Sequence, residues 1–185
     1  MKLSLQTLAS LLTVPSALAL ATPSIPPSTV NSTTNGTITP PSRYYLQTRV
    51  KDHGSSDKNG LYVSTYHTGA GFNDATLGSI EIAAAGFLNE TYQQFDLGDP
   101  FPWGMNIAGN VDDGAWDFVQ INVGLGSSGF FFNESGLQVN DLVGWLACDW
   151  WHGVPQLFWR TGFSDTSPYP SSCAEVDLLP IAIPQ

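Results

Sequence analysis

Short apolar runs separated by clusters of turn residues are the feature that most constrains the fold of this 185-residue chain. Gly 18 and Pro 13 are spread along it, and no long window keeps the 3.6-residue period of an amphipathic helix. Runs rich in Val, Ile, Phe, Tyr and Trp recur roughly every ten residues, as in small all-β proteins. This pattern predicts a single all-β domain, an antiparallel sandwich or barrel, and we favour a jelly-roll-like β-sandwich. The expected strands cover residues 44–50, 61–66, 80–84, 87–95, 105–108, 116–123, 130–132, 137–139, 142–150, 156–159 and 174–183.

Two hairpins are expected from the order of these runs. Residues 44–50 and 61–66 form the first, with a long polar loop, and alternation places Tyr44, Leu46, Thr48 and Val50 on one face. The second is shorter, with its turn at Asn-Glu-Ser-Gly, residues 133–136.

The N-terminal residues are expected to direct secretion. Lys2 is followed by a short apolar stretch and small residues that allow cleavage after Ala19 or Ala21, so residues 1–21 are typical of a signal peptide. Residues 22–42 contain Ser, Thr, Pro, Asn and Gly but no aromatic or charged residue, which predicts an extended linker. Residues 43–185 form the folded domain. No later segment is long and apolar enough for a membrane span, so we expect a secreted protein, extracellular or associated with a cell wall.

The composition supports a packed core and excludes several classes of function. Hydrophobic residues make up 42% and aromatic residues 12% of the chain, which excludes wholesale disorder. Lys+Arg number 6 against Asp+Glu 16, for a formal net charge of −10, and Arg160 is the last basic residue along the chain. A surface this acidic repels nucleic acid and anionic membranes.

The cysteines and the sequons agree with an extracellular location. Cys148 and Cys173 are the two cysteines of the chain, and in an oxidising compartment they are expected to pair. Four Asn-x-Ser/Thr sequons predict N-glycosylation at Asn31, Asn35, Asn89 and Asn133.

No sequence motif strongly indicates a cofactor, metal or catalytic site. Gly124, Gly126 and Gly129 match a dinucleotide-binding fingerprint, but the run that follows predicts a strand instead of a helix, so we interpret them as a glycine turn. Asp112, Asp113 and Asp117 are acids that could bind calcium or hydrolyse polysaccharide, yet they lack the order of an EF-hand and nothing marks a catalytic pair. We therefore assign no catalytic residue, no metal ligand and no cofactor.

Aromatic side chains are the strongest candidates for a ligand site. Trp103 stands in a proline-rich loop, and Asp149, Trp151 and His152 lie close together after residues 142–150. An exposed tryptophan face can stack on a sugar ring, whereas a buried one belongs to the core. These four residues are the candidate ligand surface. Most tryptophans on expected strands are assigned to the core.

Four segments carry a resemblance to a known family. Residues 60–75, 95–103, 144–159 and 172–180 resemble a family of small secreted proteins of filamentous ascomycete fungi, known as a domain of unknown function. The order of aromatic strands and cysteines is also loosely similar to fungal cell-wall and antigenic glycoproteins. The resemblance implies location and architecture, and it brings no activity.

Together these observations lead us to expect a secreted, non-enzymatic glycoprotein that binds carbohydrate or an extracellular protein. Two alternatives stay open: an enzyme that acts on extracellular polysaccharide, and a structural wall protein without a discrete ligand.

Overall fold

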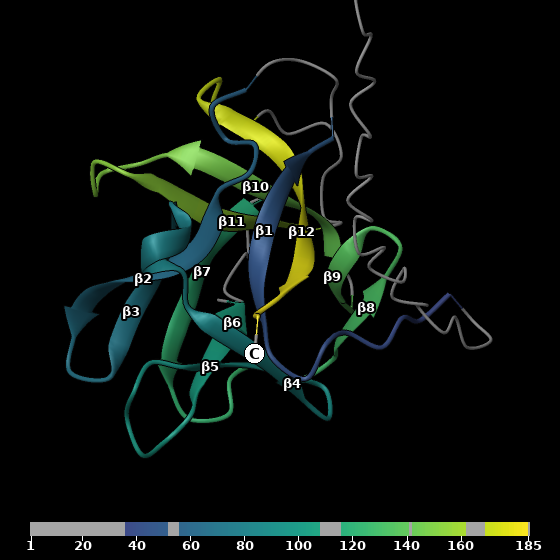
Figure 1. Cartoon of the computed structure of the whole chain (residues 1–185). Coiled ribbons are helices and arrows are strands. Elements are labelled where there is room, and N and C mark those ends of the chain that lie inside the picture. The colour runs from purple at the N-terminus through teal and green to yellow at the C-terminus, as the bar shows by residue number, and fades with distance from the viewer. Residues whose placement is uncertain (1–35, 52–55, 108–115, 141, 162–168, 185) are drawn as a thin grey trace, which may run out of the picture.

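The computed structural model describes residues 36–51, 56–107, 116–140, 142–161 and 169–184, and these residues form one β-structure (Figure 1). The one helical element among them is a short 3-10 turn, η1 (Ile80–Ile82), and no helix in this part of the chain is long and apolar enough to cross a membrane. The strands are β1 (Tyr44–Val50), β2 (Tyr62–Gly69), β3 (Phe72–Gly78), β4 (Ala85–Asn89), β5 (Tyr92–Asp96), β6 (Trp103–Ile107), β7 (Trp116–Val123), β8 (Phe130–Asn133), β9 (Gly136–Val139), β10 (Leu142–Asp149), β11 (Pro155–Thr161) and β12 (Cys173–Ala182).

The sheet closes on itself. Strand pairing runs β1-β4-β5-β6-β7-β3-β11-β10-β12, and β12 pairs back on β1 from Tyr44↔Ala182 to Val50↔Val176. The pairings are antiparallel except at Leu178↔Gly136, where β12 meets β9. The all-β antiparallel prediction is confirmed, but the expected jelly-roll-like sandwich is wrong, because the long β1–β12 pairing joins the sheet into a closed nine-strand barrel.

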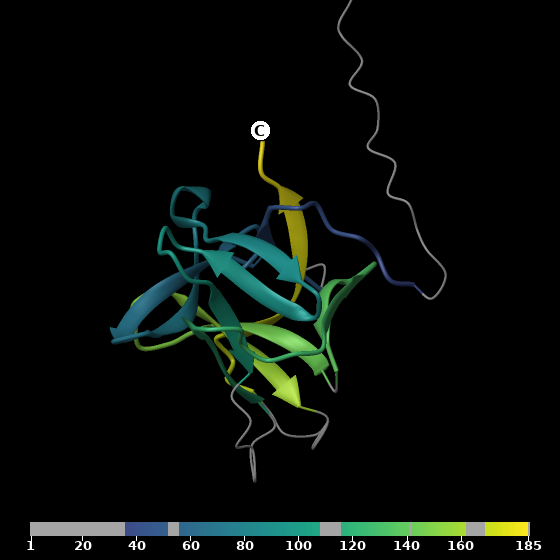
Figure 2. The ribbon, with the colours of Figure 1, turned by 90° about the horizontal axis from the view of Figure 1, so that it is seen from below.

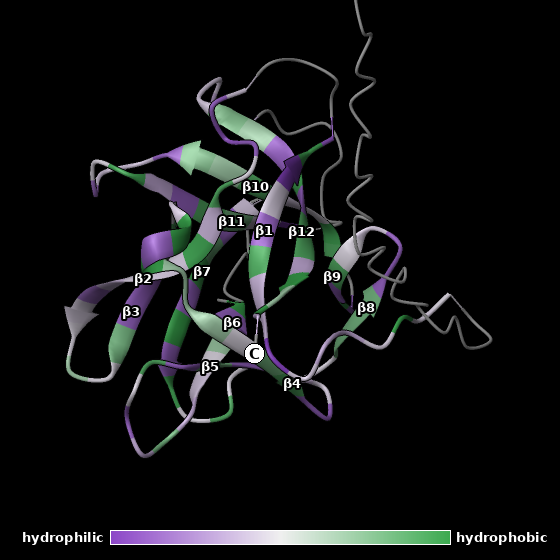
Figure 3. Cartoon of the chain, viewed as in Figure 1, coloured by the Kyte–Doolittle hydropathy of each residue, from purple (hydrophilic) through white to green (hydrophobic). Residues whose placement is uncertain are grey.

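The barrel interior is filled by alternate side chains of its strands. Tyr44, Leu46 and Thr48 are buried, as the alternation of β1 predicts, and the Tyr44 hydroxyl donates a hydrogen bond to Gln93 Oε1 at 2.6 Å. Figure 3 shows the bands of hydrophobic and hydrophilic residues that alternate along strands such as β7. The largest fully buried side chains include Trp145, Phe95, Phe130, Phe132, Met105, Ile121 and Leu137.

Several expected strands have different boundaries or partners. The expected strand over residues 87–95 is a hairpin, β4–β5, and residues 80–84 contain η1. β3 was not among the expected strands, and it is the main partner of β2, whereas β1 meets β2 only at Gln47↔Tyr62. The first expected hairpin is confirmed as an antiparallel β1–β2 pairing with a long loop, although it is short: the Thr48 backbone N–H donates to the Leu61 carbonyl at 2.7 Å beside the Gln47↔Tyr62 pair. The second is confirmed by the β8–β9 pairing from Phe130↔Val139 to Asn133↔Gly136.

The residues that precede β1 already contact the barrel. The Ile38 backbone N–H donates to the Phe132 carbonyl at 2.8 Å, and Figure 2 shows this segment running beside the β8–β9 hairpin. The expected signal peptide and most of the expected linker lie outside the described residues.

The glycine motif between β7 and β8 is a turn between strands. Gly124, Gly126 and Gly129 all have positive φ angles, of 113°, 84° and 93°. A Cβ atom at Gly126 would lie 2.5 Å from the Met105 carbonyl oxygen, so the turn packs directly on the backbone of β6. Gly126 permits this close approach, and the interpretation as a glycine turn between two strands is confirmed.

We expect Gly126→Ala to lower the free energy of unfolding by about 3 kcal/mol, from a strained backbone and overpacking. The matched control is Gly98→Ala, because Gly98 has a similar φ of 91° but nothing within 4 Å of its Cβ position. The control carries only the backbone strain, about 1 kcal/mol. Urea unfolding of both variants checks this, and equal losses would contradict the proposed backbone clash.

Candidate ligand-binding surface

The six tryptophans separate into core and surface residues. Trp103, Trp145 and Trp159 are buried, whereas Trp150 is 42% and Trp151 is 83% exposed. Trp116 is partly buried. The assignment of most strand tryptophans to the core therefore holds for Trp145 and Trp159, and the surface tryptophans lie at the end of β10.

Trp103 does not belong to the candidate surface. Its side chain is in the core cluster and only 8% exposed, so its ring face is not open to a sugar. The indole Nε1–H donates to Asp99 Oδ2 at 3.0 Å, which satisfies its polar atom at the barrel edge. Placing Trp103 on the ligand surface is contradicted by this burial, because Trp103 is the first residue of β6, paired with Phe95 and Val123, and its side chain packs in the core.

The disulfide fixes the start of the turn that carries Trp151. Cys148 on β10 and Cys173 on β12 are register partners and form a disulfide with an S–S distance of 2.04 Å, which confirms the expected pairing. On the outer wall of the barrel Cys148 packs with Leu146 and Phe158.

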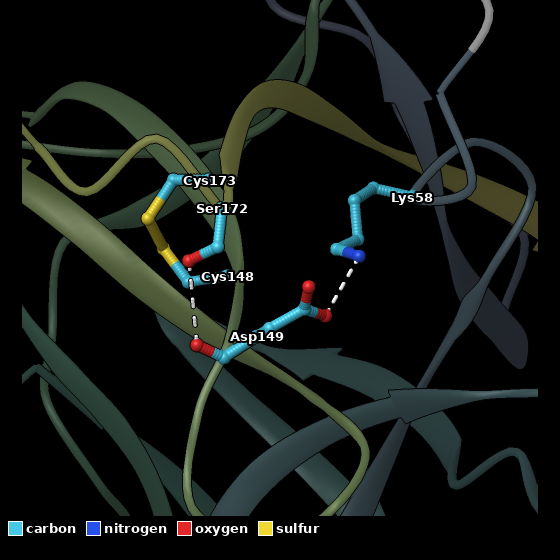
Figure 4. Close-up of a disulfide and its surroundings, with 5 residues drawn as sticks. All are labelled: Lys58, Cys148, Asp149, Ser172 and Cys173. Atoms are coloured by element: carbon cyan, nitrogen blue, oxygen red, sulfur yellow. Dashed lines mark hydrogen bonds and ion pairs between the residues drawn. A yellow bond between two sulfur atoms is a disulfide. The ribbon is translucent and has the colours of Figure 1, made fainter.

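Asp149 is held from both its side chain and its backbone (Figure 4). Its carboxylate lies 2.7 Å from Lys58 Nζ, and Ser172 Oγ donates to its carbonyl at 3.5 Å. The Lys58 side chain is only 4% exposed and also pairs with Asp57. Burial disfavours the Lys58 charge, but the hydrogen bonds with Asp149 and Asp57 outweigh it and raise the pKa of the ammonium group. Lys58 is therefore a charged anchor for the turn.

Trp150 is held by other aromatic rings. Its ring makes edge-to-face contacts with Trp116 and Phe158, at centroid distances of 5.7 and 5.3 Å. Trp116 and Phe158 also pack on each other at 5.3 Å. Such triads favour one orientation of each ring, so Trp150 is fixed although it is partly exposed.

His152, the residue after Trp151, is held by contacts with β2 and β3. Its Nε2 donates to Asp74 Oδ2 on β3 at 2.7 Å, and both side chains are largely buried. Its ring stacks on Tyr66 of β2, with centroids 4.0 Å apart and an interplanar angle of 21°. The His–Asp bond fixes the position of the imidazole, and the Tyr66 face restricts its rotation.

Trp151 is thus an exposed ring between fixed neighbours. Asp149, Trp150 and His152 are each anchored to a different part of the barrel. A cleft of about 370 Å³ is lined, among the described residues, by Trp150 and Trp151. We call Tyr66, Trp150, Trp151 and His152 the aromatic surface.

The structure brings three of the four sequence candidates together and adds partners that the sequence did not reveal. Asp149, Trp151 and His152 form one turn, while Tyr66, Asp74 and Lys58 come from β2, β3 and the residues before β2. Asp74 is 78 residues from His152 in sequence. No local spacing in the sequence connects such positions, and the exposure of Tyr66 at the end of β2 becomes visible only in the folded barrel.

The acids considered for catalysis do not form a described site. Asp112 and Asp113 lie outside the described residues. Burial raises the pKa of Asp117, against the hydrogen bond that the Phe118 backbone N–H donates to its carboxylate. Among the described residues no group of three or more His, Cys, Asp or Glu side chains is placed to hold a metal ion.

These features define a small closed β-barrel with an exposed, anchored aromatic turn on its wall. Residues 41–182 match the family described as a domain of unknown function (DUF7907), and the chain belongs to this family. No curated protein matches the chain. No solved structure matches it either.

Proposed function

We propose that this protein is a secreted glycoprotein that binds carbohydrate through its aromatic surface. The observation that carries the proposal is Trp151, which is 83% exposed although the residues on both sides of it are anchored. Covering this exposed ring with a ligand would remove apolar area from water, which favours binding. The anchors reduce the conformational entropy that a ligand would have to remove.

The chemistry of the surface favours a neutral sugar polymer. The exposed tryptophan and tyrosine rings offer apolar faces for the C–H groups of sugar rings, and their N–H and O–H groups can bind hydroxyls. Around them lie Asp74, bound to His152, and Lys58, which pairs with both Asp149 and Asp57, so each of these charged groups already has a partner. With a formal net charge of −10 the chain disfavours anionic polymers.

We expect Trp151→Ala to weaken retention on an insoluble polysaccharide about 30-fold, the effect of losing a hot-spot residue worth about 2 kcal/mol. The measurement is a binding isotherm of the full chain on chitin, β-glucan and cellulose. Because Trp151 is exposed, the variant should unfold at the same urea concentration as the wild type.

The matched control is Ile82→Ala, which removes another exposed apolar side chain, at 58% exposure, from η1, an element that contributes no residue to the aromatic surface. It should bind like the wild type. Absence of wild-type retention on all three polymers would refute carbohydrate binding, and capture of a protein partner that depends on Trp151 would instead support a protein ligand.

Glycosylation agrees with the positions of two of the four sequons. Asn89 ends β4 and is exposed, and Asn133 lies in the β8–β9 turn, where its Oδ1 accepts the Ser135 backbone N–H at 2.8 Å. Both lie in hairpin turns, where an attached glycan would project from the barrel. Asn31 and Asn35 lie outside the described residues.

A further inference from the structure

A groove separate from the aromatic surface lies on the barrel wall. It has a volume of about 670 Å³, within the usual range for small-ligand sites. It lies between the β4–β5 hairpin, the start of β1 and the loop that joins β5 to β6. None of its lining residues belongs to the aromatic surface.

The groove combines an exposed aromatic ring with polar groups. Phe101 is 41% exposed and packs against the Trp103 ring with centroids 5.8 Å apart. Pro100 and Pro102 flank it and restrict the backbone of the loop. Phe87 and Leu88 of β4 add apolar lining. A ligand with one apolar face can therefore pack against Phe101.

Polar side chains at the groove keep unused hydrogen-bonding capacity. Arg43 donates from Nη2 to Asp96 Oδ2 at 2.7 Å, and this is its one side-chain hydrogen bond within the described part of the chain. Its side chain is 55% exposed, so further N–H groups can donate to a ligand. Asp99 accepts the Trp103 indole N–H through Oδ2, and among the described residues Oδ1 has no partner.

The charged side chains at the groove favour a neutral ligand over an acidic one. Arg43 contributes one positive charge, and Asp96 and Asp99 contribute two negative charges, for a sum of −1. The Gly98 backbone N–H and Arg43 lower the pKa of Asp96, so its carboxylate stays ionised. This arrangement repels an acidic ligand, and it offers both donors and acceptors to a neutral polyol.

We infer that this groove is a second saccharide site, which takes a neutral sugar unit. Phe101 stacks on one face of the sugar ring, Arg43 donates to its hydroxyls, and Asp99 accepts from them. The inference extends the proposed carbohydrate binding, but it rests on different residues. The cleft at the aromatic surface has a volume of about 370 Å³ and is lined by two tryptophans, whereas the groove is larger, about 670 Å³, and adds Arg43 and Asp99 to an aromatic ring.

The two sites can be distinguished by the indole N–H signals of the full ¹⁵N-labelled chain. Trp103 reports on the groove through its bond to Asp99, and Trp151 reports on the aromatic surface. Trp103→Phe and Trp151→Phe assign the two signals. The probes are cellotetraose, chitotetraose and laminaritetraose, with tetragalacturonate as the acidic comparison.

We expect at least one neutral oligosaccharide to shift the Trp103 signal, with an affinity at least tenfold weaker in Phe101→Ala and Asp99→Asn. The side-chain amide of the latter variant keeps a carbonyl oxygen for the Trp103 indole, so the loop is preserved. Trp151→Ala and Ile82→Ala should leave the shift unchanged. A Trp103 signal that no neutral oligosaccharide moves, an unchanged affinity in Phe101→Ala, or equal binding of tetragalacturonate would overturn the inference.

The outcomes also separate this inference from the proposed function. A shift of Trp151 without a shift of Trp103 refutes the groove and supports the aromatic surface. A shift of Trp103 together with no retention on any polymer supports the groove and refutes binding at the aromatic surface.

Discussion

Trp145→Ala is expected to lower the free energy of unfolding by about 4 kcal/mol, the usual cost of removing a fully buried tryptophan. The Trp145 side chain is 1% exposed and belongs to the core cluster. Its indole Nε1–H donates to the Leu137 carbonyl at 2.7 Å, so truncation also leaves a buried acceptor without a partner.

The position of Trp145 makes this loss larger than that of an ordinary cavity. β9 pairs with β12 only at Gly136↔Leu178, so the Trp145–Leu137 bond is a main link between the β8–β9 hairpin and the barrel wall. Losing it should loosen that hairpin as well as the core.

Urea unfolding of Trp145→Ala, Trp145→Phe and Trp151→Ala measures this effect. We expect about 2 kcal/mol for the Phe variant, which keeps most of the apolar volume, and less than about 0.5 kcal/mol for Trp151→Ala. The slope of free energy against urea should stay constant while the midpoint falls. A loss below about 2 kcal/mol in Trp145→Ala would show that the core closes around the vacated space.

Local features of this fold could be predicted from the sequence because their signals lie within a few residues. The strand over Trp116–Val123 and the β8–β9 hairpin follow from alternation and from a turn of four residues. β3 was missed because Asn73 and Asp74 are usually turn residues. In the barrel they are buried and paired: Asn73 Nδ2 donates to the Ile121 carbonyl, and Asp74 accepts from His152.

The β4–β5 hairpin was missed for a related reason. Its turn passes through Glu90, a residue other than glycine with a φ of 56°, so the sequence lacks the usual Gly or Asn-Gly signal. Without that signal, residues 87–95 were expected to form one strand.

Closure of the barrel and assembly of the site depend on contacts between distant residues. β1 and β12 lie near opposite ends of the chain, and nothing in either strand distinguishes a barrel partner from a sandwich edge. Trp103 is buried because it starts β6 and pairs with β5 and β7, whereas Trp151 lies in the turn after β10. Sequence patterns can nominate tryptophans as ligand residues, but only the packing decides which of them face water.

Replacing both cysteines, as Cys148→Ala with Cys173→Ala, is expected to lower the free energy of unfolding by about 3.5 kcal/mol in the chain-entropy model. The bond closes a segment with a sequence separation of 25 residues, which includes β11 and the turn that carries Trp151. Alanine avoids placing a hydroxyl at Cys148, which is fully buried. Without the disulfide the unfolded chain has more conformational entropy, which favours unfolding.

The measurement is guanidinium unfolding of the wild type and the double variant, with and without a reductant. Reduction should bring the unfolding midpoint of the wild type down to that of the double variant and leave the variant unchanged, and a shift in both would point to an effect of the reductant itself.

The same variant tests what holds the aromatic surface. Lys58 and Asp74 reach the turn from outside the segment that the disulfide closes. The double variant should therefore still bind the polymer under conditions in which it is folded. Loss of binding in the folded variant would show that the disulfide, and not these two contacts, anchors Trp151.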